Sequence, residues 1–279
     1  MSGGLRTLAV RIAISTLCLS AVANCAGDTP EPPQTGQHAY STRQILSRTN
    51  YLLFLPETYG QDPAVNWPLM VFLHGIAKRG DTLEELEELK KDGPPMIVEG
   101  QLDFPFIVLS PQCPSDEYWE SQYDSLERLL DDIVDTYAVD TDRIYLTGLS
   151  MGGYGAWHWA LRDPSRFAAV VPIAGGHVQG SDEVPENICD LKDLPIWAFH
   201  GGADDVVLPM QSEVLVEALQ ACDALLRFTL YPDTDHAGSW KRAYADSELY
   251  DWLLEQTLAE SKEPFEYWMK CWGSIAFPK

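Results

Sequence analysis

The stretch RIYLTGLSMGGYGAWHWA, residues 143–160, is a strand pattern that runs directly into a helix pattern. Glycines stand at positions 148, 152, 153 and 155 of this junction, although glycine destabilises the interior of both strands and helices. Residues 148–152 read Gly-Leu-Ser-Met-Gly, the G-x-S-x-G spacing of a sharp strand-to-helix turn. Such a turn strains its serine and holds it out to solvent. We therefore predict that Ser150 is a nucleophile, against the alternative of an ordinary turn serine.

Strand patterns recur on both sides of this stretch, with helix patterns between them. Residues 126–137 and 214–222 have apolar positions three and four apart, which is typical of helices, and residues 82–93 form a shorter amphipathic pattern that also predicts a helix. Continuous apolar runs favour strands that are covered on both faces of a parallel sheet. The alternation predicts an α/β fold, a doubly wound and mostly parallel sheet with helices on both faces. The predicted strands are NYLLFLP, PLMVFLHG, FPFIVLSP, RIYLTG, AAVVPIAGG, PIWAFHGG and RFTLYPD.

Length and charge restrict the classes of function. The chain has 279 residues, 46% of them hydrophobic, and a formal net charge of -23. This length and apolar content fit one large domain. Because nucleic acids and anionic membranes would repel so acidic a protein, we expect neither as a partner. No His or Cys spacing is typical of a zinc site, so we expect no metal and no other cofactor.

The N-terminal residues have the pattern of an export signal. Residues 1–23 contain two arginines, then an apolar run too short to span a bilayer, then small residues, as in a secretory signal peptide. Cys25 leaves open a second interpretation, a bacterial lipoprotein acceptor site. Either pattern predicts a secreted or periplasmic protein, with any membrane attachment through lipid on Cys25. We expect residues 24–43 to be a Pro-rich linker.

After these segments, the chain divides into a domain and a tail. We assign residues 44–260 to the catalytic domain and 261–279 to a C-terminal extension. Export permits disulfides, and the four cysteines that follow the signal region allow three pairings, with buried free thiols as the alternative. These cysteines are Cys113, Cys189, Cys222 and Cys271.

A serine nucleophile requires a base, and the base requires an orienting carboxylate. After a G-x-S-x-G turn these groups follow in the order Ser, Asp, His, each after a later strand. The run LPIWAFHGGADDVV places Asp204 or Asp205 just past one strand, and FTLYPDTDHAGSW places His236 just past the next. Order and loop context therefore select His236 among the six histidines.

The oxyanion of the transition state requires backbone donors. The N–H of Met151, the residue after the nucleophile, is one predicted donor. The run VFLHGIAKRG ends a strand in His-Gly, and from it we choose the N–H of Ile76, with Ala77 as the alternative. Trp119 and Trp240 are predicted to form an aromatic wall for substrate, against the alternative of core packing.

Several spaced blocks of this chain resemble one enzyme family. The blocks PLMVFLHGIAKRGD, FPFIVLSPQCP, VDTDRIYLTGLSMGGYGAWHWA, LPIWAFHGGADDVVLP and HAGSWKRAYADSELYDWL are similar to α/β-hydrolases that are secreted bacterial carboxylesterases. That group is related to dienelactone hydrolase, to feruloyl and polyhydroxybutyrate-cleaving esterases and to the catalytic domain of prolyl oligopeptidases. The resemblance covers roughly residues 44 to 256. It implies the α/β-hydrolase fold, with Ser150 as nucleophile, Asp204 as acid and His236 as base.

This chain departs from the family pattern at the histidine. Asp235 stands where the family usually has glycine, and one extra residue separates His236 from the following Ser-Trp. The histidine loop is therefore expected to differ. The segment between residues 176 and 191 is too short for a large cap, so we expect an open cleft.

The expected function is that of an exported serine carboxylic ester hydrolase that forms an acyl-enzyme. Its expected substrates are short-chain or aryl esters of acetyl or feruloyl type, free or linked to polysaccharide. One alternative is a serine peptidase of prolyl oligopeptidase type, for which the chain has no room to encode the propeller that selects peptides. The other is an exported binding protein on an inactive hydrolase scaffold, which the loss of a triad residue would favour.

Overall fold

The computed structural model describes residues 33–42 and 49–258. The chain divides into the units Met1–Pro33 and Gln34–Lys279, and every element below belongs to the second unit. None of the helices in the described part has the length and hydropathy needed to cross a membrane. The predictions for residues 1–23 and 261–279 concern residues that lie outside the described part.

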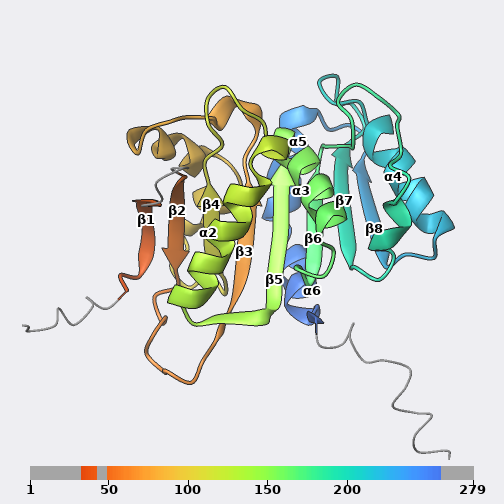
Figure 1. Cartoon of the computed structure of the whole chain (residues 1–279). Helices are drawn as coiled ribbons and strands as arrows, with labels where there is room; N and C mark the ends of the chain where they lie inside the picture. Colours follow the sequence, from red (N-terminus) through yellow and green to blue (C-terminus); the bar gives the residue numbers. More distant parts are fainter. Residues whose placement is uncertain (1–32, 43–48, 259–279) are drawn as a thin grey trace, which may run out of the picture. The chain divides into compact units, whose positions relative to one another are not determined.

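An eight-stranded sheet forms the centre of the second unit, in the order β1-β2-β4-β3-β5-β6-β7-β8. The strands from β3 to β8 run parallel to one another, whereas β2 is antiparallel to both of its neighbours, β1 and β4 (Figure 1). The predicted doubly wound, mostly parallel sheet is confirmed, and none of the described residues forms a large cap over it. The strands are β1 Gly36–Ser41, β2 Asn50–Leu55, β3 Trp67–Leu73, β4 Ile107–Pro111, β5 Val139–Leu149, β6 Ala169–Ile173, β7 Ile196–Gly201 and β8 Leu226–Tyr231.

Helices cover both faces of the sheet. Along β3, Val71 packs into a cluster with residues of α2, α3 and α4, and its neighbour Phe72 packs into a second cluster with residues of α1, α5 and α6. This alternation follows from the two-residue period of a strand. Figure 1 shows α2 and α3 in front of the sheet and α6 behind it. The α-helices are α1 Gly93–Val98, α2 Tyr123–Thr136, α3 Met151–Arg162, α4 Met210–Ala221, α5 His236–Ala245 and α6 Ser247–Glu255.

Short 3-10 helices connect these elements. Residues 82–93 were predicted to form a short amphipathic helix, and the structure has a helix there, of the 3-10 type. Leu86 and Leu89 are its buried residues, and their spacing of three matches the three residues per turn of a 3-10 helix. The 3-10 helices are η1 Ile76–Lys78, η2 Glu84–Lys91, η3 Trp119–Ser121 and η4 Ile188–Leu191.

The sheet begins earlier than the predicted domain start at residue 44. β1 lies within the predicted linker, residues 24–43, and pairs with β2 from Gly36 opposite Leu55 to Ser41 opposite Asn50. Tyr40 also stacks on Tyr51, with ring centroids 5.5 Å apart. Because β1 is an edge strand and only partly buried, it needs no continuous apolar run. Its polar sequence therefore gave no strand signal.

One disulfide joins two elements beside the sheet. Cys189 of η4 is bonded to Cys222, just after α4, with the two Cα atoms 5.6 Å apart. Cys113 is a free thiol with no exposed surface, and burial raises its pKa to about 12. Cys271 lies outside the described residues. Of the possible arrangements of the four cysteines, the structure thus contains one disulfide and one buried thiol.

Reduction of this disulfide should destabilise the protein. The bond closes a loop with a sequence separation of 33, and loop-closure entropy predicts a loss of about 3 to 4 kcal/mol in the free energy of unfolding. Urea denaturation with and without reductant measures this loss. The matched control is the double variant Cys189→Ser/Cys222→Ser, whose unfolding should not respond to reductant. Equal responses in both proteins would contradict this role of the bond.

Candidate active site

Ser150 occupies the turn between the end of β5 and the start of α3. Its backbone has φ 54° and ψ -120°, a strained conformation for a residue with a side chain. The Ser150 N–H donates to the Ile173 carbonyl at 2.9 Å, and the Tyr154 N–H donates to the Ser150 carbonyl at 3.1 Å. Strand β6 and helix α3 thus hold the strained turn on both sides.

The glycines of the motif allow three backbone segments to approach closely. A Cβ on Gly148 would lie 2.2 Å from the Gly152 carbonyl oxygen, and a Cβ on Gly152 would lie 1.9 Å from the Leu73 carbonyl oxygen. Atoms of side chains do not approach a backbone this closely, so any other residue would push α3 away from the ends of β3 and β5. The two glycines therefore set the position of the serine.

The structure brings Ser150, His236 and Asp204 into one hydrogen-bonded chain. His236 Nε2 lies 2.9 Å from Ser150 Oγ, and His236 Nδ1 lies 2.7 Å from Asp204 Oδ2. Because an ionised carboxylate only accepts, the Nδ1–H donates to Asp204, which leaves the Nε2 lone pair free for the serine hydroxyl. This is the geometry in which an imidazole can take the hydroxyl proton.

Asp204, and not Asp205, is the carboxylate in contact with the histidine. Asp204 is 3% exposed, and its Oδ1 accepts the N–H groups of Val206 and Val207 at 3.0 and 2.9 Å. Asp205 is exposed to solvent. The tight turn after β7 thus fixes one carboxylate toward His236 and leaves the next outside.

His200 is a further residue of this site that the sequence reasoning did not select. Its Nε2 lies 2.9 Å from the Val207 carbonyl and 3.3 Å from Asp204 Oδ2. Burial lowers the pKa of His200, so the imidazole is neutral. It therefore supports the Asp204 turn without adding charge. Its sequence signal was the spacing His-x-x-x-Asp at the end of an apolar run, His200 to Asp204.

Asp235, which stands where the resembling family usually has glycine, caps the helix that carries His236. His236 is the first residue of α5, and Asp235 is the residue before that helix. The Asp235 Oδ1 accepts the Gly238 N–H at 2.7 Å, which is an N-terminal helix cap. Asp235 thereby starts a helix at the histidine itself.

The predicted oxyanion donors lie beside the serine. Ile76 and Met151 line one cavity together with Ser150, and no acceptor for either N–H is found in the described part of the chain. Ala77, the alternative donor residue, lines a neighbouring cavity that also contains Ser150. The geometry is compatible with Ile76 and Met151 as the pair of donors.

His74 orients the peptide that carries the Ile76 N–H. Burial lowers the pKa of His74 to about 4, so the ring is neutral. Its Nε2 accepts the Cys113 N–H at 3.0 Å, which leaves the proton on Nδ1, 2.8 Å from the Gly75 carbonyl oxygen. In a trans peptide the C=O and the next N–H point in opposite directions. The bond that holds the Gly75 carbonyl therefore also directs the Ile76 N–H.

Of the two tryptophans predicted to form a wall for substrate, Trp119 is buried in the core and Trp240 lines a cavity at the site. Trp119 is 1% exposed, and its Nε1–H donates to the His74 carbonyl at 3.0 Å. This burial contradicts its predicted contact with substrate. Trp119 instead packs against α3 at Gly155, where a Cβ would lie 2.8 Å from the Trp119 Cβ, so the close contact requires glycine. Trp240 lines a cavity with Ser150 and His236, and its ring lies edge-on to the His236 ring with centroids 5.0 Å apart.

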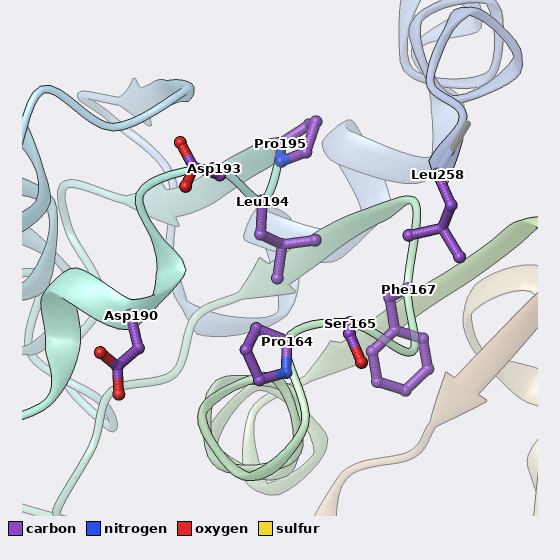
Figure 2. Close-up of a pocket in the computed structure, with 8 residues that line it drawn as sticks. All are labelled: Pro164, Ser165, Phe167, Asp190, Asp193, Leu194, Pro195 and Leu258. Carbon is purple, nitrogen blue, oxygen red and sulfur yellow. The ribbon is translucent and has the colours of Figure 1, made fainter. Parts of the chain in front are cut away.

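A separate hollow lies away from these residues. Figure 2 shows Phe167 and Pro195 in its wall. Phe167 comes shortly before β6 and Pro195 directly before β7, so this hollow lies at the amino edge of the parallel strands, whereas Ser150 follows the carboxyl end of β5. Ligands of such sheets bind at the carboxyl edge. In the described ranges, no group of three or more His, Cys, Asp or Glu side chains could hold a metal ion.

Comparison with known proteins finds relatives of this chain among hydrolases and esterases. Residues 115–251 match the Dienelactone hydrolase family. A bifunctional acetylxylan esterase/xylanase of Neocallimastix patriciarum is 28% identical over 153 residues, which are 54% of this chain and 21% of that protein. A protein described as a carboxymethylenebutenolidase in Escherichia coli strain K12 is 31% identical over 101 residues, 35% of this chain and 37% of that protein.

A solved structure has the same fold. The crystal structure of a thermostable esterase superimposes with a TM-score of 0.66 and 30% identity, over 79% of this chain and 63% of that chain. The chain thus covers less than two thirds of each relative's length. The sheet topology, the family match and these relatives together identify the chain as an α/β-hydrolase related to the dienelactone hydrolase family.

Proposed function

We propose that the protein is a serine carboxylic ester hydrolase that works through an acyl-enzyme. The observation that carries this proposal is the chain of hydrogen bonds from Ser150 through His236 to Asp204, built on a serine with φ 54°. The related proteins are named as esterases or as an enzyme that acts on a lactone, a cyclic ester, which supports the same reaction.

The geometry accounts for each step of ester cleavage. His236 Nε2 accepts the Ser150 proton as Oγ attacks the ester carbonyl carbon. The carbonyl oxygen, now negative, accepts the N–H groups of Ile76 and Met151. Asp204 stabilises the imidazolium. When the intermediate collapses, the C–O bond to the alcohol breaks, His236 returns the proton to the leaving oxygen, and the acyl group stays on Ser150.

A water molecule completes the cycle by the same route. His236 removes a proton from the water as its oxygen attacks the acyl carbon. The second intermediate then releases the carboxylic acid, and Ser150 Oγ recovers its proton from His236. Every proton transfer uses one nitrogen, so a single positioned imidazole serves both half-reactions.

We propose short-chain or aryl esters, of acetyl or feruloyl type, as the substrates. The cavities on the two sides of Ser150 are small, about 110 and 190 Å³, and Trp240 lines one of them. Within residues 33–42 and 49–258, no large cap encloses the cleft around a long chain.

We also propose that the protein works outside the cytoplasm. The disulfide between Cys189 and Cys222 supports this proposal, because such bonds persist in oxidising compartments. The signal-like pattern of residues 1–23 has the same implication.

Replacement of the nucleophile should abolish ester hydrolysis. We expect Ser150→Ala to lower kcat for 4-nitrophenyl butanoate by about 10⁴ or more, because the triad works as a unit, while circular dichroism shows an unchanged fold. A fluorophosphonate should add its mass to Ser150 in the wild-type protein and to no residue of the variant. Labelling at another residue, or full activity of the variant, would contradict the proposed mechanism.

The two adjacent aspartates provide a matched pair of variants. Asp204→Asn should lower kcat by about 10⁴, since an amide favours the wrong imidazole tautomer. Asp205→Asn removes the same charge one residue further along, on an exposed side chain, and should change kcat less than threefold. Steady-state kinetics with one ester compares them. A reversed ranking would assign the acid to Asp205.

The export proposal predicts where processing occurs. In a bacterial host, mass spectrometry of the mature protein should place its N-terminus between residues 24 and 28. If lipid is attached, the mass increment should disappear in Cys25→Ser. A full-length chain recovered from the cytoplasm with its leader intact would contradict both pathways.

A further inference from the structure

Two cavities of different chemistry meet at Ser150. The first, which we name the Trp240 cavity, is mostly apolar and is lined by residues that include Phe72, Leu149, His236 and Trp240. The second, the Glu120 cavity, is lined by Tyr118, Glu120, Met151, Tyr154, Gln179 and Val207. Both cavities also contain Ile76, Ser150 and Val206. An ester bound at Ser150 therefore has one space for its acyl part and another for its alcohol.

The position of the base determines which part enters which cavity. His236 must return its proton to the leaving oxygen of the alcohol. His236 lines the Trp240 cavity but not the Glu120 cavity. The alcohol therefore lies in the Trp240 cavity beside His236 Nε2. The acyl group, which remains on Ser150 after the alcohol leaves, extends into the Glu120 cavity.

The Glu120 cavity has a negative charge that no permanent cation compensates. No lysine or arginine lines it, and the basic group recorded beside the Glu120 carboxylate among the described residues is His158 Nε2 at 4.0 Å, which carries a charge only when it is protonated. By contrast, Lys78 in the Trp240 cavity is paired with Glu88 and Asp92 at 3.6 and 3.5 Å. The two cavities thus differ in charge as well as in polarity.

The groups around Glu120 do not cancel its charge. Burial and the neighbouring His158 lower the pKa of His177, which keeps that ring neutral. Arg79 stacks on the Tyr118 ring and donates to the Glu117 carbonyl at 3.1 Å, and it does not line the cavity. The carboxylates of Asp116 and Glu117 lie on the same loop. An acyl group in this cavity therefore encounters a negative potential.

We infer that Glu120 makes the acyl site select by charge, favouring esters whose acyl group is cationic and rejecting those whose acyl group is anionic. This inference rests on the proposed ester hydrolase function. Glu120 has 43% of its side chain exposed, so water screens it, and we expect an effect of about tenfold in selectivity instead of complete exclusion. The effect should weaken in high salt.

Three esters of 4-nitrophenol with acyl groups of similar length test this inference. The cation is the 4-(trimethylammonio)butanoate, the neutral isostere is the 5,5-dimethylhexanoate, and the anion is the monoester of glutaric acid. The quantity to measure is the cation-to-anion ratio of kcat/KM, corrected for the uncatalysed rate. We expect Glu120→Gln to lower this ratio by about tenfold and Glu120→Lys to reverse the preference.

The control variant is Asp116→Asn, which removes an equal charge from an exposed residue of the same loop that lines neither cavity. It should change the ratio less than twofold. An unchanged ratio in Glu120→Gln, or an equal change in Asp116→Asn, would overturn the inference. No turnover of the neutral ester by the wild-type protein would instead overturn the proposed ester hydrolase function.

A second pair of esters tests the assignment of the cavities. Acetylcholine and 3,3-dimethylbutyl acetate have the same acyl group and differ only in the charge of the alcohol. Their ratio of kcat/KM should respond less than twofold to Glu120→Gln, because the alcohol lies in the other cavity. A tenfold response in this pair, with none in the acyl series, would place the alcohol beside Glu120 and overturn the assignment.

Discussion

The close approach of three backbone segments at the nucleophile is the constraint on which the site depends. Gly152 lies against the Leu73 carbonyl so tightly that a Cβ would approach within 1.9 Å of its oxygen. That contact holds the first turn of α3 against the end of β3 and forces Ser150 to φ 54°. Because β3 also leads directly into the loop with Ile76, one contact positions both the proposed nucleophile and a proposed oxyanion donor.

The other two groups of the proposed triad reach this point because the strands are parallel. The carboxyl ends of β5, β7 and β8 lie at one edge of the sheet, so Ser150, Asp204 and His236 meet although 86 residues separate the first from the last. Each group is then fixed locally: Asp204 by two backbone N–H groups and His200, His236 by the start of α5. A neutral His200 is important here, since a charged one would compete with His236 for the Asp204 carboxylate.

The same edge also explains the proposed selectivity. The loop after β4 carries Glu120, and the loop after β8 leads to Trp240, so the two sides of Ser150 are built from unrelated segments. Their chemistry can therefore vary independently while the triad stays in place. In this chain the Trp240 cavity is mostly apolar, and its Lys78 is paired with two carboxylates. The Glu120 cavity has a carboxylate whose recorded basic neighbour in the described part is His158.

The fold class, the nucleophile turn and the chain order of the three triad candidates were predictable from the sequence, because they depend on local spacing and on hydrophobic period. Spacing alone did not separate Asp204 from Asp205, since both follow β7; the family resemblance selected Asp204, and the turn geometry aims its carboxylate inward. Nor did the sequence reveal that β1 pairs with β2, because an edge strand needs little apolar burial.

Contacts between segments that are distant in the chain were visible in the folded structure alone. Trp119 was predicted to contact substrate, but it is buried under α3, because a tryptophan has the same sequence signature in a core as in a cleft. The pairing of Cys189 with Cys222, the support of Ile76 by His74 and the division into two cavities also arise from packing across the sheet. Sequence spacing reports neighbours along the chain, whereas these contacts depend on which elements fold against one another.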